Sequence, residues 1–325
     1  MHAMNRYGWL LAVLLLGIGR PAAGAESVPT PGLAADRLPC AGARLVGRIA
    51  SDRLVECSGM ETSLADRDLL WAVNDGGGGP FVYALGVDGR DRGRFRVAGV
   101  GNRDWEGMDT FLWQGRPMIL IADFGDNQRQ YATHSIFILE EPRLDGERLV
   151  PTASVGLRWR IDFAYPDGPH DAEGVAVDRH AGEILVLTKR DAPPRLFALP
   201  LQPPAPGVRV TARPVTVLNR IPRPTREDLR HPYGDVRSQP TAMDLSADGR
   251  SMIVLTYKHA YLFSRTPGES WAGALGRGPA LIRLPLPQYC RELRQREAVC
   301  FSRDESSLLV TSEGQGAGIF RLAAR

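Results

Sequence analysis

The sequence predicts an all-β fold, a β-propeller of five four-stranded blades closed by the N-terminal strand. Three observations predict it. A sequence pattern typical of two short strands joined by a turn occurs five times, beginning at residues 56, 104, 171, 241 and 296. The copies follow one another at about sixty residues, which indicates a repeat built from a small sheet. The last copy has room for three strands, and residues 43–50 form a lone strand that can complete it.

The clearest copy occupies residues 170–189. It opens with Glu173-Gly174, continues as a short alternating strand, and closes with an apolar run at 184–187 before Lys189. Alternation and short apolar runs bounded by turn residues are both typical of β-strands. This copy therefore defines the first two strands of each blade.

The remaining strands follow from similar runs between turns. They are expected at 69–73, 81–87 and 93–100; at 119–122, 135–139 and 154–162; at 184–188, 195–199 and 208–218; at 252–256, 260–264 and 280–284; and at 298–302, 307–312 and 318–322. No helix is expected, and the proline-containing stretch 220–239 is interpreted as a surface loop. A six-bladed ring is the alternative if 220–239 or 150–163 contains a degenerate repeat.

The N-terminus has the order of residues typical of a secretory signal peptide. A basic residue precedes an apolar stretch at 9–18, which is too short to span a bilayer, and small residues follow at 23–25. We therefore expect a signal peptide at 1–25, a flexible leader at 26–42 and a single propeller domain at 43–325. The protein would then be periplasmic or secreted.

Export would place the four cysteines in an oxidising compartment, where disulfides form. Three pairings are open, and proximity in the sequence favours Cys40 with Cys57 and Cys290 with Cys300. The formal net charge of +3 gives no electrostatic case for binding nucleic acid or an anionic membrane. We expect a monomer.

The repeat gathers charged residues at one rim of the ring. In a blade, the first strand lines the channel and the second runs antiparallel beside it, so the start of one and the end of the other share a rim. The predicted partners, blade by blade, are Glu56 with Asn74 and Asp75, Glu106 with Asp123, Glu173 with Lys189, Thr241 with Lys258, and Glu297 with Glu313.

Four glutamates around a narrow axis would repel one another unless a cation neutralises them. A hard divalent cation is the usual solution, and Ca²⁺ suits an exported protein. Two other interpretations stay open: the glutamates accept backbone hydrogen bonds and bind nothing, or one of them is a catalytic carboxylate that works without a metal.

The two lysines of the chain, Lys189 and Lys258, fall at the same step of the repeat. A compact ammonium group there suits an anionic ligand or a carboxylate of the rim. The alternative is a chance coincidence, or a simple pairing with Glu173 and its neighbours.

Several short motifs resemble those of exported bacterial β-propellers of the phytase-like and esterase-like kind, and more loosely of gluconolactonase and strictosidine-synthase propellers. They are Glu-x-Ser-Gly at 56–59, Asn-Asp-Gly at 74–76, Asp-Trp-Glu at 104–106, Asp-x-Gly-Asp-Asn at 123–127 and Asp-x-Glu-Gly at 171–174. The resemblance implies Ca²⁺ or another divalent cation, and hydrolysis of phosphate esters or lactones. The resemblance also implies that five residues face the metal: Glu56, Glu106, Asp123, Glu173 and Glu297.

We therefore predict a metal-dependent hydrolase of an anionic ester, lactone or phosphate ester. Glu106, Glu173, Lys189 and Lys258 are its catalytic candidates: one of the two glutamates activates water and the lysines hold the anionic group. Two alternatives remain: a non-catalytic propeller that binds a small anion or sugar at the same place, and a scaffold that binds another protein of the cell envelope. Propellers serve all three purposes.

Overall fold

The computed structural model describes residues 42–149, 154–285 and 290–323. The chain divides into two compact units, Met1–Leu38 and Pro39–Arg325, and the first lies outside the described residues. The signal peptide and leader at 1–42, which fall almost entirely there, remain predictions. No helix of the described segments is long and apolar enough to cross a membrane.

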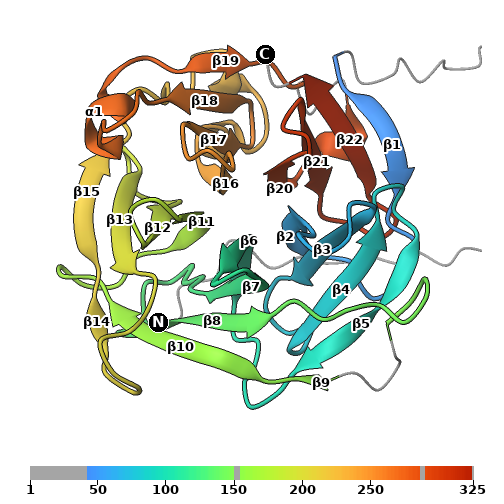
Figure 1. The fold of residues 1–325 in the computed structure, drawn as a ribbon. Coiled ribbons are helices and arrows are strands. Elements are labelled where there is room, and N and C mark those ends of the chain that lie inside the picture. Colours follow the sequence, from blue (N-terminus) through green and yellow to red (C-terminus); the bar gives the residue numbers. More distant parts are fainter. Residues whose placement is uncertain (1–41, 150–153, 286–289, 324–325) are drawn as a thin grey trace, which may run out of the picture. The chain divides into compact units, whose positions relative to one another are not determined.

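The second unit is a ring of five β-sheets, as the repeat predicted (Figure 1). Each sheet has four main antiparallel strands. From the channel outward they are β2 (Cys57–Thr62), β3 (Leu69–Asn74), β4 (Phe81–Gly86) and β5 (Asp91–Val97) in blade 1; β6 (Trp105–Trp113), β7 (Arg116–Asp123), β8 (His134–Glu140) and β10 (Leu157–Ala164) in blade 2; β11 (Ala172–Asp178), β12 (Glu183–Thr188), β13 (Arg195–Pro200) and β15 (Arg213–Val217) in blade 3; β16 (Pro240–Leu245), β17 (Ser251–Thr256), β18 (Ala260–Ser264) and β19 (Ala280–Ile282) in blade 4; and β20 (Arg296–Phe301), β21 (Ser307–Ser312), β22 (Gly318–Ala323) and β1 (Arg44–Arg48) in blade 5.

The N-terminal strand closes the ring. β1 pairs antiparallel with β22, so blade 5 takes three strands from one end of the chain and one from the other. Closure of this kind pairs strand edges that would otherwise stay open. The prediction that residues 43–50 complete the last blade is confirmed.

The six-bladed alternative is wrong. Residues 157–164 form the outermost main strand of blade 2, and 220–239 carry only the short 3₁₀ helices η1 (Asp228–Arg230) and η2 (Gly234–Val236). Two-residue parallel strands, β9 (Ser154–Val155) and β14 (Val210–Thr211), extend blades 1 and 2.

The prediction of no helix is also wrong. α1 (Trp271–Gly276) begins after Ser270, whose side chain caps it, and buries Trp271, Ala274 and Leu275. A six-residue helix is too short to show a convincing period in the sequence. A further 3₁₀ helix, η3 (Arg291–Leu293), precedes β20.

The hydrophobic core lies between the blades. Five buried clusters each join the facing surfaces of two neighbouring sheets, and large side chains such as Trp71, Trp105 and Phe197 are fully buried within them. The five innermost strands β2, β6, β11, β16 and β20 pack against their neighbours around the axis. The core thus fixes which residues face the channel.

Both predicted disulfides are wrong. Cys57 and Cys300 are buried free thiols, so neither can be the partner assigned to it. Cys290 is disulfide-bonded, and Cys40 lies outside the described residues. Proximity in the sequence misled the prediction, because Cys57 and Cys300 sit on innermost strands and are held in the core between blades 5 and 1.

Candidate functional site

Every innermost strand carries a bulge at its second residue. The pairing with the second strand of the blade shifts register there in all five blades. The residues at this position are Ser58, Glu106, Glu173, Thr241 and Glu297. A bulge re-aims one side chain out of the alternating pattern of a strand. The repeat therefore builds one ring of polar side chains, which we call the bulge ring.

A small residue follows each bulge residue: Gly59, Gly107, Gly174, Ala242 and Ala298. At Gly174 an added Cβ would lie 2.9 Å from the Leu187 side chain, and at Gly59 it would lie 3.0 Å from Val73. Close packing against the second strand explains why small residues stand here. The pair formed by a polar residue and a small residue is the signal that locates the bulge ring in the sequence.

Glu56 does not belong to the bulge ring. Its side chain is exposed and precedes β2, while Ser58 occupies the equivalent position and donates a hydrogen bond to the Trp105 carbonyl (2.6 Å). Alignment of the repeats on their glutamates, instead of on the following small residue, misplaced the first blade by two positions.

A second set of side chains reaches the same mouth from the residue that follows each second strand. Asp75, Lys189, Tyr257 and Glu313 occupy this position, and the fifth member, Phe124, packs into the core between blades 2 and 3. Asp123, one residue earlier, instead accepts the backbone N–H of Asp104 (2.9 Å) and secures the rim.

Lys189 is the central cation of the mouth. Its buried ammonium group pairs with Glu173 and lies 5.2 Å from the Tyr257 ring centroid. Burial disfavours the charged form, but Glu173 and Glu297 outweigh it and raise the pKa of Lys189 well above its ordinary value. The Tyr257 hydroxyl donates to Glu297 (2.6 Å), which links blades 4 and 5.

Lys258 does not join Lys189. Its ammonium group binds Asp228 of the 220–239 loop (2.7 Å), and Arg237 binds the other oxygen of the same carboxylate (3.1 Å). Tyr257, not Lys258, is the residue that points to the channel. A one-residue offset at the end of a strand directs a side chain to the other face. Lys189 therefore pairs with a carboxylate of the mouth, whereas Lys258 pairs with Asp228 of the loop.

Three carboxylates converge on one side of the mouth. Oxygens of Asp75, Asp104 and Glu106 all lie within 4.8 Å of one another, and we call this group the mouth cluster. Burial, and next the neighbouring Asp75, raise the pKa of Asp104 to about 8. Burial, followed by Glu173 and Asp75, raises the pKa of Glu106 well above its ordinary value. One ammonium group therefore faces more acids than it can neutralise.

Glycines allow the mouth cluster to form. A Cβ at Gly125 would lie 2.5 Å from Asp104 and 2.7 Å from Glu106, and a Cβ at Gly76 would lie 2.7 Å from the Arg103 carbonyl. Any side chain at Gly125 would push the two acids apart. The Asp-x-Gly loop that was predicted at 123–127 thus contributes its glycine, while its first aspartate serves the backbone.

Across the mouth, several buried oxygens have no hydrogen-bond partner among the residues that the structure describes. They are Glu173 Oε2, Glu297 Oε2, Thr241 Oγ1 and Ser312 Oγ. Buried oxygens are normally satisfied, so this arrangement has unused capacity for donors or a cation. Glu313 lies at the same mouth, where burial and Glu297 raise its pKa to about 8.

The channel is closed below the mouth. Met60, Met108, Val175, Met243 and Val299 line a cavity of only about 10 Å³ together with neighbouring residues. That volume is about the space of one water molecule. This part of the channel therefore holds at most about one water molecule and is too small for a ligand.

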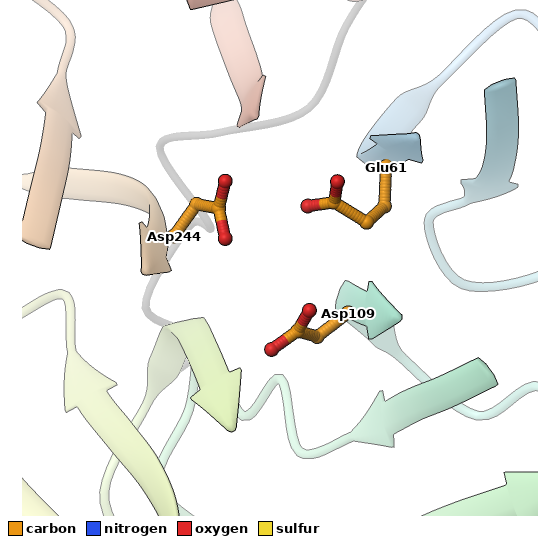
Figure 2. Close-up of side chains that lie close together, drawn as sticks. All are labelled: Glu61, Asp109 and Asp244. Carbon is orange, nitrogen blue, oxygen red and sulfur yellow. The ribbon is translucent and has the colours of Figure 1, made fainter. Parts of the chain in front are cut away.

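A second acidic group lies near the opposite end of the innermost strands. Glu61, Asp109 and Asp244 come from blades 1, 2 and 4 and point toward one another, with oxygens within 4.8 Å (Figure 2). We call them the lower cluster. Burial raises the pKa of Asp109 to about 7 and, together with neighbouring acids, raises that of Glu61 and Asp244 well above the ordinary value.

The lower cluster is engaged by backbone amides. Asp109 accepts N–H groups from Val177 of the next blade (2.6 Å) and from Thr110 (2.5 Å). Asp244 likewise accepts from Phe301 of the next blade (2.7 Å) and from Leu245 (2.6 Å). These carboxylates satisfy exposed edges of innermost strands, which have no sheet neighbour on the channel side. The sequence prediction missed this cluster because it followed only the strand starts.

No family model matches the chain, and no curated protein does. Among solved structures, the chain is similar to a chain of a nidogen/laminin complex, with 10% identity over 80% of this chain and 73% of that one, and a TM-score of 0.42. It is also similar to a gluconolactonase from Xanthomonas campestris (12% identity, 89% and 92% covered, TM-score 0.43) and to the β-propeller domain of Cps50 (Swd1) from Myceliophteria thermophila (12%, 83% and 74%, 0.34). At such low identities and TM-scores, these likenesses give no information about function.

Proposed function

We propose that the mouth cluster binds a divalent cation, with Ca²⁺ as the best fit. The bound cation would in turn bind an oxygen of an anionic small molecule at the mouth. The observation that carries the proposal is the convergence of Asp75, Asp104 and Glu106 oxygens within 4.8 Å. Ca²⁺–oxygen distances of 2.3–2.6 Å allow two ligand oxygens to lie up to about 5 Å apart. The observed spacing therefore suits one ion between three side chains.

The donor chemistry supports the same proposal. No backbone amide of the described residues donates to the carboxylates of Asp104 or Glu106, whereas Asp75 accepts the amide of Gly76 and lies in hydrogen-bond contact with Asp104. Gly125 leaves room for these two acids, since an added Cβ there would lie 2.5 Å from Asp104 and 2.7 Å from Glu106. Hard carboxylate oxygens are the ligands that Ca²⁺ prefers.

We further propose hydrolysis of an ester, lactone or phosphate ester as the reaction. A bound cation would polarise the substrate oxygen and lower the pKa of a bound water. Glu173 has a buried oxygen that accepts no hydrogen bond from a described residue, and burial raises its pKa well above the ordinary value. We assign this oxygen the role of the general base. Lys189 holds Glu173 from the opposite oxygen, so its role is to position the base, while Lys258 anchors the loop.

Binding and turnover are tested separately. Calorimetric titration of the chelator-treated protein with CaCl₂ should give heat of binding that Glu106→Gln abolishes while the variant stays folded. A screen of phosphatase, esterase and lactonase substrates should show turnover that chelator stops. Calcium binding without any turnover would leave a ligand-binding protein, and an unchanged titration in Glu106→Gln would contradict the cation site itself.

A second candidate function rests on the 220–239 loop. Leu229 and Tyr233 are 61% and 66% exposed, on a loop whose base is fixed by the Asp228 ion pairs. Exposed aromatic and aliphatic side chains on a rigid base suit a protein partner of the cell envelope. Replacing Leu229 and Tyr233 by Ser should abolish such an interaction without changing cation binding.

Export to the periplasm or medium also stays a proposal, on the strength of residues 1–25. Mass spectrometry of the N-terminus of the protein recovered from a secreting host tests it. Cleavage after residue 25 is expected, and an intact N-terminus would contradict export through this segment.

A further inference from the structure

A separate cavity of about 790 Å³ opens between blades 1 and 2. Its walls are the loop after β2, the β6–β7 hairpin and the segment after β8. β2 and β6 begin at the channel mouth, so these walls stand at the opposite rim. Small-molecule pockets commonly have volumes of about 300–1,000 Å³, and this cavity lies within that range.

The floor of the cavity is rigid. Glu141, a buried carboxylate of blade 2, accepts hydrogen bonds from the indole of Trp71 (2.8 Å), from the Leu64 amide (3.1 Å) and from the Ser63 hydroxyl. Arg303 of blade 5 donates to the Leu64 carbonyl (3.0 Å) from the other side. Three blades thus hold the loop after β2 in one place.

Each acid of the cavity has a partner among the described residues, although Asp66 uses only one oxygen. Glu141 accepts three hydrogen bonds, Glu140 pairs with Arg116 (3.1 Å), and Asp66 accepts the Asp68 amide (2.9 Å). Arg67 and Arg143 line the cavity with exposed side chains and form no ion pair or hydrogen bond with any described residue.

We propose that this arginine groove binds a small molecule through an oxyanion, a phosphate or carboxylate group held by Arg67 and Arg143. A planar guanidinium group matches the oxygens of either group and forms charge-assisted hydrogen bonds with them. The contacts of Ser63 and Leu64 fix the backbone of the loop that carries Arg67, which lowers the ordering cost of binding. The groove is separate from the channel mouth, since none of its lining residues belongs to the bulge ring or the mouth cluster.

The test uses two simple probes, inorganic phosphate and succinate, titrated calorimetrically into the whole protein at low ionic strength. At least one should bind, and the double variant Arg67→Ala/Arg143→Ala should weaken that binding about tenfold or more, because charge-assisted hydrogen bonds are lost. A matched control replaces Arg90 and Arg250, two exposed arginines outside the groove, by Ala. The control should bind as the wild type does.

Glu106→Gln separates the groove from the mouth: with chelator present, so that the mouth holds no cation, the variant should leave phosphate and succinate binding unchanged. Tighter binding of phosphate than of succinate would identify a phosphate-bearing ligand, and the reverse order a carboxylate-bearing one. Equal affinity of the wild type and the Arg67/Arg143 variant, an equal loss in the control, or no binding of either probe would overturn the proposal. Melting curves of both variants establish that they are folded.

Discussion

The two ends of the channel hold the same kind of residue and use it differently. At the mouth, Asp75 accepts only the adjacent Gly76 amide, and Asp104 and Glu106 receive no backbone amide among the described residues. At the lower cluster, Asp109 and Asp244 each accept two amides, one of them from the next blade. Three close carboxylates are therefore not by themselves a cation site: what matters is how many of their oxygens the protein already uses.

The largest effect is expected from removal of the ammonium group at the mouth. Lys189→Met leaves Glu173 and Glu297 buried without their cation, and breaking a buried pair in this way costs about 3–5 kcal/mol. The free energy of unfolding from urea titration at pH 7.5 measures the loss. The double variant Lys189→Met/Glu173→Gln should recover part of this loss. A single variant as stable as the wild type would show that Lys189 contributes little to the stability of the buried Glu173 and Glu297.

The next effect distinguishes the two clusters by calcium. At a Ca²⁺ concentration of about 100 times its dissociation constant, the free energy of unfolding of the wild type should rise by about 2.7 kcal/mol. Glu106→Gln should lose this gain, while the matched lower-cluster variant Asp109→Asn should keep it. The opposite result would assign the cation to Glu61, Asp109 and Asp244.

The lower cluster should make the protein less stable as the pH rises. The folded state raises the pKa of Asp109 to about 7, from an ordinary value of 3.8, so it binds this proton more tightly than the unfolded chain does. The stability that this proton contributes is present below pH 4 and is lost as the pH rises toward and through 7.

Asp109→Asn removes the charge but keeps only one acceptor oxygen, so one of the amides of Thr110 and Val177 loses its acceptor and the variant should be less stable than the wild type at pH 5. Between pH 5 and pH 8 the wild type should lose about 2 kcal/mol more stability than the variant does. The comparison is made by chemical unfolding at pH 5 and pH 8 in the presence of chelator. A wild type that is equally stable at both pH values would mean that repulsion in the lower cluster is relieved in another way.

The smallest effect is expected at the second lysine. Lys258→Met removes one donor from Asp228, but Arg237 and Thr225 still bind that carboxylate. A loss of about 1 kcal/mol is therefore expected, with faster proteolysis of the 220–239 loop and unchanged calcium binding. A loss of stability as large as that of Lys189→Met would mean that Lys258 stabilises the fold as much as Lys189 does, and would contradict the difference between the two lysines.

Much of the fold could be predicted because it follows from local sequence patterns. The repeated strand pairs, the missing fourth strand of the last blade and residues 43–50 together determine five closed blades. The short helix at 271–276 and the disulfide pairing could not be predicted, since the first depends on packing against blades 3 and 4 and the second on which strands become neighbours.

The candidate site was predicted in part. Alternation and the small residue at Gly107, Gly174 and Ala298 are enough to bring Glu106, Glu173 and Glu297 to one mouth. Glu56 was misplaced because the first repeat carries Ser58 at the bulge, and Tyr257 was missed in favour of its neighbour Lys258.

By itself, the sequence determined the number of blades, the closure and the gathering of polar residues at one rim, because these follow from period and order along the chain. Only the tertiary structure decided which carboxylates keep free oxygens, which ammonium group faces the axis and where the lower cluster forms. Those outcomes depend on bulges and on contacts between blades, where a shift of one residue turns a side chain from the channel to the rim.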